Sequence, residues 1–488
     1  MKANTCSAAW LLVLVPIFDP TVASVHALAA SISSKKIRKP WNRLNVPKSS
    51  APVNPEDMGV VTNSVDSTAS TGTQLPVVDD GKASIPSEIF SLAKTIVGAS
   101  CFGLPAAISA FGSAPSATLS ASLVILSVGC LSGYGFSLIG RVCAYTGAKS
   151  YKEAWANTVS PQSAWTVSAF SILVCLSGLL AYTMVLTDTS VKLFAAASVV
   201  VSKPQALLSL MLCALLPLCR LKRLSMLAPF AMVGIGAMLY TVFVMGLRYF
   251  QGAYAVGGAF YTAATAGSFG SVGAAGIFHP SAFVLISMLA TAFSSHYNAP
   301  KFYNELRDNT VARFNTVVAS GYSLAGFVYI LVATFGFLTF GSNSLPMILQ
   351  NYATSDGLLN IARLAVSASI LTSYPLTFTG VRDGVLDIAG VKNRTDKVLD
   401  SVTVGLLATL SILSLVVTNL GAVWAIGGAT YGTALTVIIP PIMFIRCVLR
   451  NKHLKLKREL PLAATTLVLG VAMSIIGTVK AIQRFRPV

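Results

Sequence analysis

A group of unusual residues interrupts the apolar segment that runs from Phe90 to Gly112. The group consists of Lys94, the run Gly98-Ala99-Ser100, Gly103 and Pro105. In hydrocarbon every backbone polar group needs a partner, so this pattern indicates a helix that breaks where it lines a cavity. Freed N–H groups around Phe102 to Leu104 would bind a carboxylate, and freed carbonyls around Val97 to Ala99 would bind a cation or an ammonium group. The pattern predicts a site for a small zwitterion; the alternative is a face of small residues that lets two helices pack closely.

A second interrupted segment lies near the middle of the chain, at residues 281–299. Its apolar residues give way to a polar stretch made of Ser294, Ser295, His296, Tyr297 and Asn298, followed by Pro300. Two broken spans in corresponding positions are what a five-plus-five inverted repeat predicts, with the site at the midplane between the halves. His296 is either satisfied by a neighbouring helix or functional, and the cost of an ionisable group inside a membrane favours function.

The elements that would position both sites are membrane spans. Of 488 residues, 54% are hydrophobic and only 11% are charged, and the mean hydropathy is +0.71. This composition is typical of a polytopic membrane protein. A window of about 19 residues predicts about eleven spans. To within a few residues they cover 90–112, 116–140, 164–188, 204–219, 226–249, 281–299, 316–340, 357–380, 400–418, 421–447 and 461–480.

The positive charges gather in the short connections between these spans. The formal net charge is +18, but the basic residues concentrate on one side of the membrane, so no nucleic-acid partner is predicted. The positive-inside rule places the N-terminal tail on the cytosolic or stromal side and the C-terminus opposite. The eight cysteines and four histidines show no metal-ligand spacing, and no ATP-binding motif is present. We therefore predict no metal site and no cofactor.

The N-terminal part differs in composition from the rest. Residues 1–30 combine a positive charge, a short apolar run and small residues, as a signal peptide does. Residues 31–50 are basic and contain no Asp or Glu, as in a transit peptide; the alternative is a basic tail after an ordinary secretory signal. Residues 51–88 are predicted to be a disordered tail, and residues 89–482 the transmembrane domain. We predict a plastid membrane, or otherwise an endomembrane or the plasma membrane.

Five motifs follow one another between about residue 89 and the last span. They are LAKTIVGASCFGLP from Leu92, FSSHYNAPKFYNEL from Phe293, FGFLTFGSNSLPMILQNY from Phe335, ARLAVSASILTSYPLTFTGVRD from Ala362 and TNLGAVWAIGGATYGTALTVIIPPIMFI from Thr418. These motifs resemble the amino acid/auxin permease family of transmembrane amino acid transporters. The resemblance implies an all-α polytopic protein with about eleven transmembrane helices in the inverted-repeat fold of amino acid–polyamine–organocation carriers. It also implies secondary transport of amino acids, driven by sodium or by protons.

The resemblance also assigns site residues by their positions in these motifs. At the break in span one, the amino-acid moiety would be bound by Val97, Gly98, Ala99, Ser100, Phe102 and Gly103. The other side of the pocket would be formed by Phe293, Ser294, Ser295 and Asn298 in span six. In sodium-coupled relatives, hydroxyls on span eight hold the ion, and Thr372 and Ser373 occupy that position here.

Lys94 is the main departure from the sodium-using relatives. System A and system N members resemble this segment but have Asn where Lys94 stands, whereas the proton-coupled branch resembles it with a lysine. An ammonium group can stand where a sodium ion would, so the resemblance predicts sodium-independent symport in which Lys94 exchanges a proton. His296 is the second candidate for proton coupling. The alternative is that Lys94 snorkels to the basic side and takes no part.

Two further functions remain open from the sequence. An amino-acid-sensing transceptor would use the N-terminal tail to bind a partner protein. An intramembrane enzyme would need a catalytic pair, and Ser295 beside His296 is the nearest candidate. Adjacent residues of a helix point in different directions, so we predict no catalytic residue and no enzymatic activity. The predicted partners are an amino acid, the lipid bilayer and protons; Asp188 and Lys192, one helical turn apart, are predicted to form an ion pair.

Overall fold

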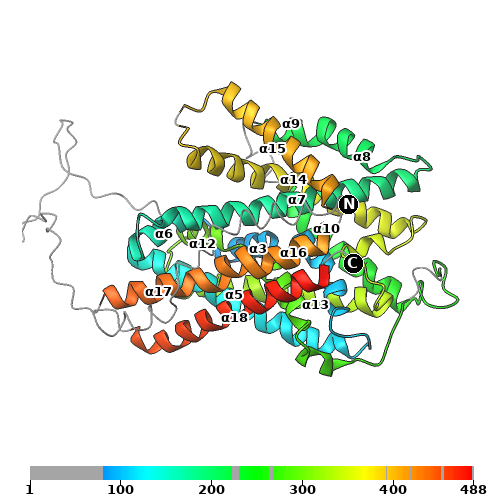
Figure 1. Ribbon diagram of the computed structural model, residues 1–488, viewed down its shortest axis with the longest axis horizontal. Helices are drawn as coiled ribbons and strands as arrows, with labels where there is room; N and C mark the ends of the chain where they lie inside the picture. The colour runs from blue at the N-terminus through cyan, green and yellow to red at the C-terminus, as the bar shows by residue number, and fades with distance from the viewer. Residues whose placement is uncertain are drawn as a thin grey trace, which may run out of the picture. The chain divides into compact units, whose positions relative to one another are not determined.

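The computed structural model describes residues 81–221, 230–262, 267–391, 393–417, 419–451 and 456–485, and for 230–233 it gives the helix without the side chains. The predicted signal peptide, the predicted transit peptide and most of the predicted tail lie outside these residues. All the regular elements of the described chain are helices (Figure 1). It contains no strand, and its isolated β-bridges join Ala83 to Leu306 and Ser268 to Gly341.

Seven helices of the described chain are long and apolar enough to cross a membrane. They are α5 (Ala117–Thr146), α7 (Ala164–Ala196), α13 (Val311–Phe340), α14 (Gly357–Ile388), α15 (Asp396–Val416), the segment Leu420–Arg450 with α16 (Leu420–Gly427) and α17 (Ile439–Arg450), and the segment Lys457–Phe485 with α18 (Leu460–Phe485). An eighth span results if α3 (Ile85–Ile96) and the bent continuation Ala99–Ile108 count as one. The prediction of an all-α polytopic membrane protein is confirmed, and the count of about eleven spans stays a prediction.

The remaining helices are not among these seven spans. α8 (Lys203–Leu210) and α9 (Leu216–Cys219) form one apolar segment, and α10 (Phe230–Phe250) forms another. After a break, α11 (Ala282–Ala292) is followed by α12 (Ala299–Glu305). The other two are α4 (Leu104–Ile108), which completes span one, and α6 (Tyr151–Thr158), which follows α5. The segments α8–α9, α10 and α11–α12 overlap three of the spans that the hydropathy pattern predicts.

Local sequence explains where the helices around the site begin and end. At the start of α3 the Ser84 hydroxyl accepts a hydrogen bond from the N–H of Ser87, and at the start of α14 the Asp356 carboxylate accepts one from the N–H of Leu358 (3.2 Å). Such side chains satisfy N–H groups that a helix start leaves free. α5 ends at Gly147, whose φ of 68° is left-handed and costs a glycine little.

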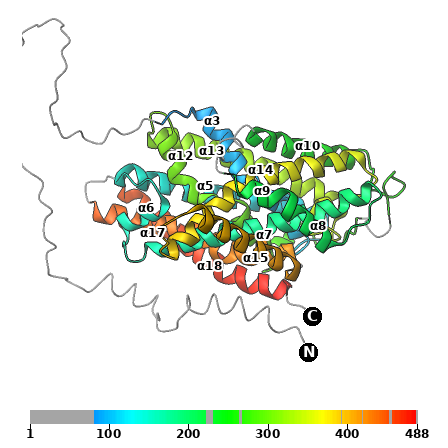
Figure 2. The ribbon, with the colours of Figure 1, turned by 90° about the horizontal axis from the view of Figure 1, so that it is seen from above.

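α13 and α14 are the helices around which the site is built. α13 packs against α3, α4 and α5, and α14 packs against α7 and α10. Figure 2 shows α10 alongside α14. The first broken span therefore lies against α13, and α7, α10 and α14 form the neighbouring wall.

The folded domain begins earlier than the predicted end of the tail at residue 88. Ala83 N donates to Glu305 O at 3.0 Å, and Arg307 N donates to Ala83 O at 3.0 Å. α3 then begins at Ile85. Residues 81–88 therefore belong to the folded domain, because their backbone pairs with the end of α12 although their composition resembles that of the tail.

The predicted ion pair between Asp188 and Lys192 is wrong. Asp188 Oδ1 lies 2.8 Å from Lys203 Nζ, at the start of α8, and Asp188 Oδ2 accepts a hydrogen bond from Gln350 Nε2 at 3.1 Å. The connection after α7 folds back and places Lys203 beside the carboxylate. Asp188 thus pairs with Lys203, which is distant along the chain, and not with Lys192, which lies one turn away on the same helix.

Candidate functional site

The first break lies between α3 and the helical turns that follow it. α3 ends at Ile96, Gly98 is extended, and a 3-10 helix begins at Ala99, so that the two segments meet at 47°. The predicted interruption of span one is confirmed. The helix resumes earlier than predicted because Gly98 O accepts a hydrogen bond from Cys101 N at 3.3 Å, which closes the first turn. Within the described chain, no backbone bond is formed by the N–H groups of Ala99 and Ser100, which are therefore the free ones at the new helix start.

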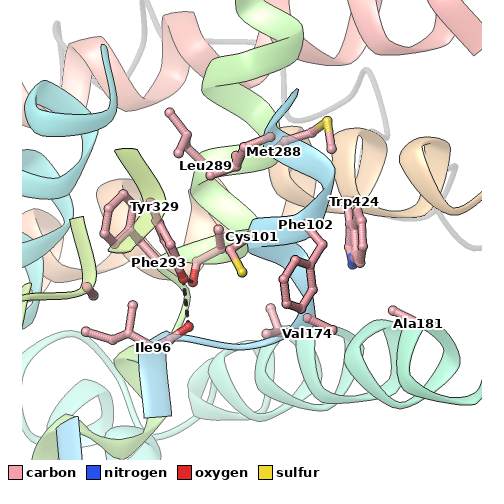
Figure 3. Packing of buried hydrophobic residues seen from close by; sticks show 14 of the residues in the cluster. Ile96, Cys101, Phe102, Val174, Ala181, Met288, Leu289, Phe293, Tyr329 and Trp424 are labelled. Atoms are coloured by element: carbon pink, nitrogen blue, oxygen red, sulfur yellow. Dashed lines mark hydrogen bonds between the residues drawn. The ribbon is translucent and has the colours of Figure 1, made fainter. Parts of the chain in front are cut away.

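The second break separates α11 from α12. α11 ends at Ala292, residues 293–295 are not helical, and a short 3-10 turn leads into α12. The prediction of a second interrupted span is confirmed. Both breaks contact one side chain of α13: Tyr329 Oη lies 2.7 Å from Ile96 O and 2.7 Å from Ala292 O. Figure 3 shows the first of these hydrogen bonds in the packed core around Phe102 and Phe293.

A cavity of about 120 Å³ lies beside the first break, between α3, α7, α10, α13 and α14. The break contributes Val97, Gly98 and Ala99 to its lining, and the polar side chains that line it are Lys94, Tyr182, Ser369 and Ser373. No carboxylate lines the cavity within the described chain. A Cβ placed on Gly98 would have the Tyr182 hydroxyl as its closest neighbour, at 3.4 Å. Gly98 therefore faces the cavity and is not pressed against another helix.

Gly103 serves helix packing instead. A Cβ placed on Gly103 would lie 2.6 Å from a ring carbon of Trp424 and 2.7 Å from Cε of Met288. Figure 3 shows both side chains beside the 3-10 turn. The sequence left two explanations for the small residues, a cavity lining and close helix packing. Gly98 fits the first because it faces the cavity, and Gly103 fits the second because it lies in a close helix contact.

Lys94 lies in the last turn of α3, and its half-buried side chain reaches α10 and α14. A Cβ placed on Gly234 would lie 3.1 Å from Lys94 Cε and 2.6 Å from Ser369 Oγ. Lys94, Gly234, Ser369 and Ser373 line the same cavity. The Lys94 side chain therefore lies close to Ser369 of α14, and its predicted role in ion or proton coupling stays a prediction.

The hydroxyls predicted on α14 are arranged differently from one another. Thr372 Oγ1 and Ser373 Oγ both donate to Ser369 O, at 2.9 and 3.0 Å. Their protons are used within the helix, and their oxygen lone pairs remain acceptors. Ser373 lines the cavity and Thr372 does not. Ser369 was not predicted as a site residue, although it lies one turn before Ser373 and shares its face of the helix.

The other predicted substrate residues are close to the breaks but outside the cavity. Phe102 and Phe293 are fully buried, and the Phe293 ring centroid lies 4.9 Å from that of Tyr329. Ser295 is buried and its hydroxyl lies 3.3 Å from Tyr322 Oη, whereas Ser294 Oγ has no partner among the described residues. Outside the cavity lining are also Ser100, Gly103 and Asn298. Their substrate role stays a prediction.

Comparison with known proteins identifies the chain. A profile of the family described as transmembrane amino acid transporter protein matches residues 81–483. The chain belongs to this family. Crystalline MhsT in complex with L-phenylalanine matches 82% of this chain and 99% of its own chain, with a TM-score of 0.54 and 12% identity. The two proteins share a fold, and the inverted repeat within this chain stays a prediction.

Three curated relatives are named as amino acid transporters. A human protein whose name refers to sodium-coupled neutral amino acid transport is 25% identical, over 41% of this chain and 50% of that protein. Amino acid transporter AVT6A of Arabidopsis thaliana is 30% identical, over 40% of this chain and 44% of that protein. Vacuolar amino acid transporter 5 of Schizosaccharomyces pombe is 25% identical, over 75% of this chain and 84% of that protein. The match to the first two relatives spans about half of their length.

His296 is fully buried and lies outside the cavity. Its Nε2 atom lies 2.9 Å from Ser132 O, and its ring meets that of Phe136 edge-on, with centroids 5.5 Å apart. The neighbouring helix α5 thus satisfies one ring nitrogen, while Nδ1 has no partner among the described residues. Ser295 bonds to Tyr322 and His296 to a carbonyl, so the two are not arranged as a nucleophile and its base.

A buried ion pair joins two walls of the cavity, α10 and α14. Arg248 Nε and Nη2 donate to the two carboxylate oxygens of Asp356, at 2.9 and 2.8 Å, and Asp356 is fully buried. Tyr254 Oη donates to Asp356 Oδ2 at 3.1 Å, and burial together with this carboxylate raises the pKa of Tyr254. This pair was not predicted from the sequence. Its signal was an Asp directly before a predicted helix, the usual place of a cap.

Proposed function

We propose that this transporter is a sodium-independent secondary carrier that moves amino acids by alternating access, with Lys94 in the place of a coupling ion. The observation that supports the proposal is the position of Lys94 beside Ser369 and Ser373 in the cavity at the break. A cation there is favoured by the partial negative charge at the C-terminal end of α3. The hydroxyl oxygens of α14 add further acceptors.

The positive charge that Lys94 carries when protonated would make sodium dispensable. A sodium ion at such a site is held by carbonyl and hydroxyl oxygens, and these oxygens repel one another when no cation is present. The ammonium group supplies the positive charge from within the chain. During the cycle Lys94 would release and regain a proton, which couples uptake to pH, and His296 is the second candidate for this step.

The substrate would be bound at the first break through both of its charged ends. The free N–H groups of Ala99 and Ser100 form a site for the carboxylate, and the carbonyl at the end of α3 is an acceptor for the ammonium group. The predicted residues of span six, Phe293, Ser294, Ser295 and Asn298, would close the pocket. The relatives are named as amino acid transporters, which agrees with this substrate class.

The test is uptake of labelled amino acids by the purified protein in liposomes. We expect uptake of at least one amino acid when choline replaces sodium, and a dependence of the rate on a pH gradient. Uptake that stops in choline would overturn sodium independence and would support coupling of the kind named for the human relative. A folded protein that carries no amino acid under any gradient would overturn the carrier function itself.

We also propose that residues 1–50 direct the transporter to a plastid membrane. A signal-like segment followed by an acid-free basic segment supports this proposal. A reporter fused after Ser50 should reach the plastid in a host whose plastids have additional membranes. Deletion of residues 31–50 should leave the reporter in the endomembrane system. A reporter that is secreted in both cases would contradict the proposal.

A further inference from the structure

Tyr329 lies where the two broken spans meet. It is fully buried on α13, and its hydroxyl oxygen lies 2.7 Å from both Ile96 O and Ala292 O. These carbonyls belong to the last residues of α3 and α11, and within the described chain no backbone N–H donates to either of them. A phenol has a single proton. Tyr329 therefore donates to one carbonyl at a time, and the other carbonyl remains an acceptor.

We propose that Tyr329 is a positioning residue for transport, which joins the two broken spans through one shared proton. The proposal rests on the carrier function proposed above. Buried carbonyls need donors, so Tyr329 stabilises the end of α3 or the end of α11, and its proton can pass from one to the other only while both carbonyls stay beside the hydroxyl. The carbonyl that Tyr329 leaves free keeps its lone pairs for another N–H donor. Ile96 and Ala292 are buried and lie outside the cavity lining, so a bound amine would reach this carbonyl once the break opens. Substrate binding and the relative position of the two half-helices thereby depend on the same group.

Two other buried tyrosines, Tyr322 and Tyr374, serve as controls for Tyr329. Tyr322, two turns earlier on α13, places its hydroxyl 3.3 Å from Ser295 Oγ and 3.5 Å from Phe293 O, so it contacts the second break alone. Tyr374 of α14 places its hydroxyl 3.1 Å from Thr183 Oγ1 and contacts neither break. The three side chains are buried to a similar degree. Replacing each with Phe keeps the ring and removes one hydroxyl.

A native cysteine reports on the first break without substrate. Cys101 is fully buried in the 3-10 turn that follows the break. Its reaction with a maleimide requires this turn to move away from its neighbours. The rate at which Cys101 is labelled, resolved by mass spectrometry of its peptide, therefore measures how firmly the turn is held in the empty carrier.

The experiment compares Tyr329→Phe, Tyr322→Phe and Tyr374→Phe in the purified full-length transporter. For Tyr329→Phe we expect labelling of Cys101 to be several times faster, and KM for uptake to rise about tenfold, the change produced by loss of about 1.4 kcal/mol of binding. Tyr374→Phe should change neither quantity. Tyr322→Phe should raise the labelling rate less than Tyr329→Phe does.

Several outcomes would overturn the proposal. One is wild-type labelling of Cys101 in Tyr329→Phe, and another is an equal increase in Tyr329→Phe and Tyr374→Phe, which would reflect general loosening. A lower melting temperature in Tyr329→Phe with unchanged KM and unchanged labelling would show a purely structural role. If the wild type carries no amino acid, the carrier function fails, and the labelling rates still decide whether Tyr329 holds the break.

Discussion

The Lys94 side chain lies directly against Gly234, with its Cε atom 3.1 Å from the position that a Cβ would take on that glycine. The same position is 2.6 Å from Ser369 Oγ. Any side chain at 234 would therefore push apart the lysine of α3 and the hydroxyl of α14. The contact makes α10 a third participant in the site, although α10 carries no charged group in the cavity lining.

Gly234→Ala should therefore reduce transport. The added methyl group must displace Ser369 or Lys94, and we expect the rate of uptake at saturating substrate to fall by about tenfold, the equivalent of about 1.4 kcal/mol. Gly236→Ala is the matched control, because a Cβ on Gly236, in the same helix, would meet nothing within 4 Å. It should retain full uptake and melt at an equal or higher temperature, since alanine favours a helix by about 1 kcal/mol over glycine. Equal uptake by the two variants would contradict the role given to this contact.

Gly98 and Gly103 should respond differently to substitution. Gly98 has extended backbone angles open to any residue and faces the cavity, so Gly98→Val should weaken substrate binding and leave the melting temperature nearly unchanged. Gly103→Val would collide with Trp424 and should destabilise the fold by about 1–3 kcal/mol, as overpacking does. Binding of a labelled amino acid and thermal unfolding in detergent separate the two effects. A stable Gly103→Val protein would show that the contact with Trp424 can relax.

The sequence predicted both breaks because glycine, proline and polar residues inside apolar segments have few explanations in a membrane. It also pointed to Lys94 and to the hydroxyl face of α14, since these residues follow from motif position and helix spacing. The first turn of the new helix, which begins at Ala99, could not be predicted, because it depends on one bond between Gly98 and Cys101.

The sequence also could not predict which side chains distant in the chain form hydrogen bonds or ion pairs with one another. Tyr329 meets Ile96 and Ala292 only because three helices cross at one point. A tyrosine in an apolar span gives no sign of what its hydroxyl will contact. Asp188 likewise had a plausible partner one turn away, and the fold supplied Lys203 instead. Local spacing predicts faces of helices, and tertiary packing decides which groups meet across them.

The Arg248–Asp356 pair should contribute far more to stability than a surface pair of similar geometry. Arg248→Met would leave a fully buried carboxylate without its cation, which should cost about 3–5 kcal/mol of unfolding free energy. Arg220 forms a comparable two-pronged pair with Asp400, but both side chains are nearly half exposed. Arg220→Met should therefore cost less than about 1 kcal/mol. Thermal and denaturant unfolding of both variants test this, and similar losses would show that burial does not set the strength of the pair.

Lys94→Asn should change the ion dependence of transport. The variant removes the charge beside Ser369 and Ser373 and leaves their oxygens, with the C-terminal carbonyls of α3, without a cation. We expect uptake in choline to fall at least about tenfold, which corresponds to about 1.4 kcal/mol, and sodium to restore part of it by occupying the vacated position. The pH dependence of uptake should weaken in parallel if Lys94 carries the proton.

The control for this prediction is Lys192→Asn, which removes a lysine that does not line the cavity. It should behave as wild type in sodium and in choline at every pH. Uptake by wild type, Lys94→Asn and Lys192→Asn is then measured in both media across a pH series. Equal uptake by Lys94→Asn and wild type in choline would mean that the lysine is not a substitute for the ion. Because its side chain would then be free to extend toward the basic side, that result would favour the snorkelling alternative.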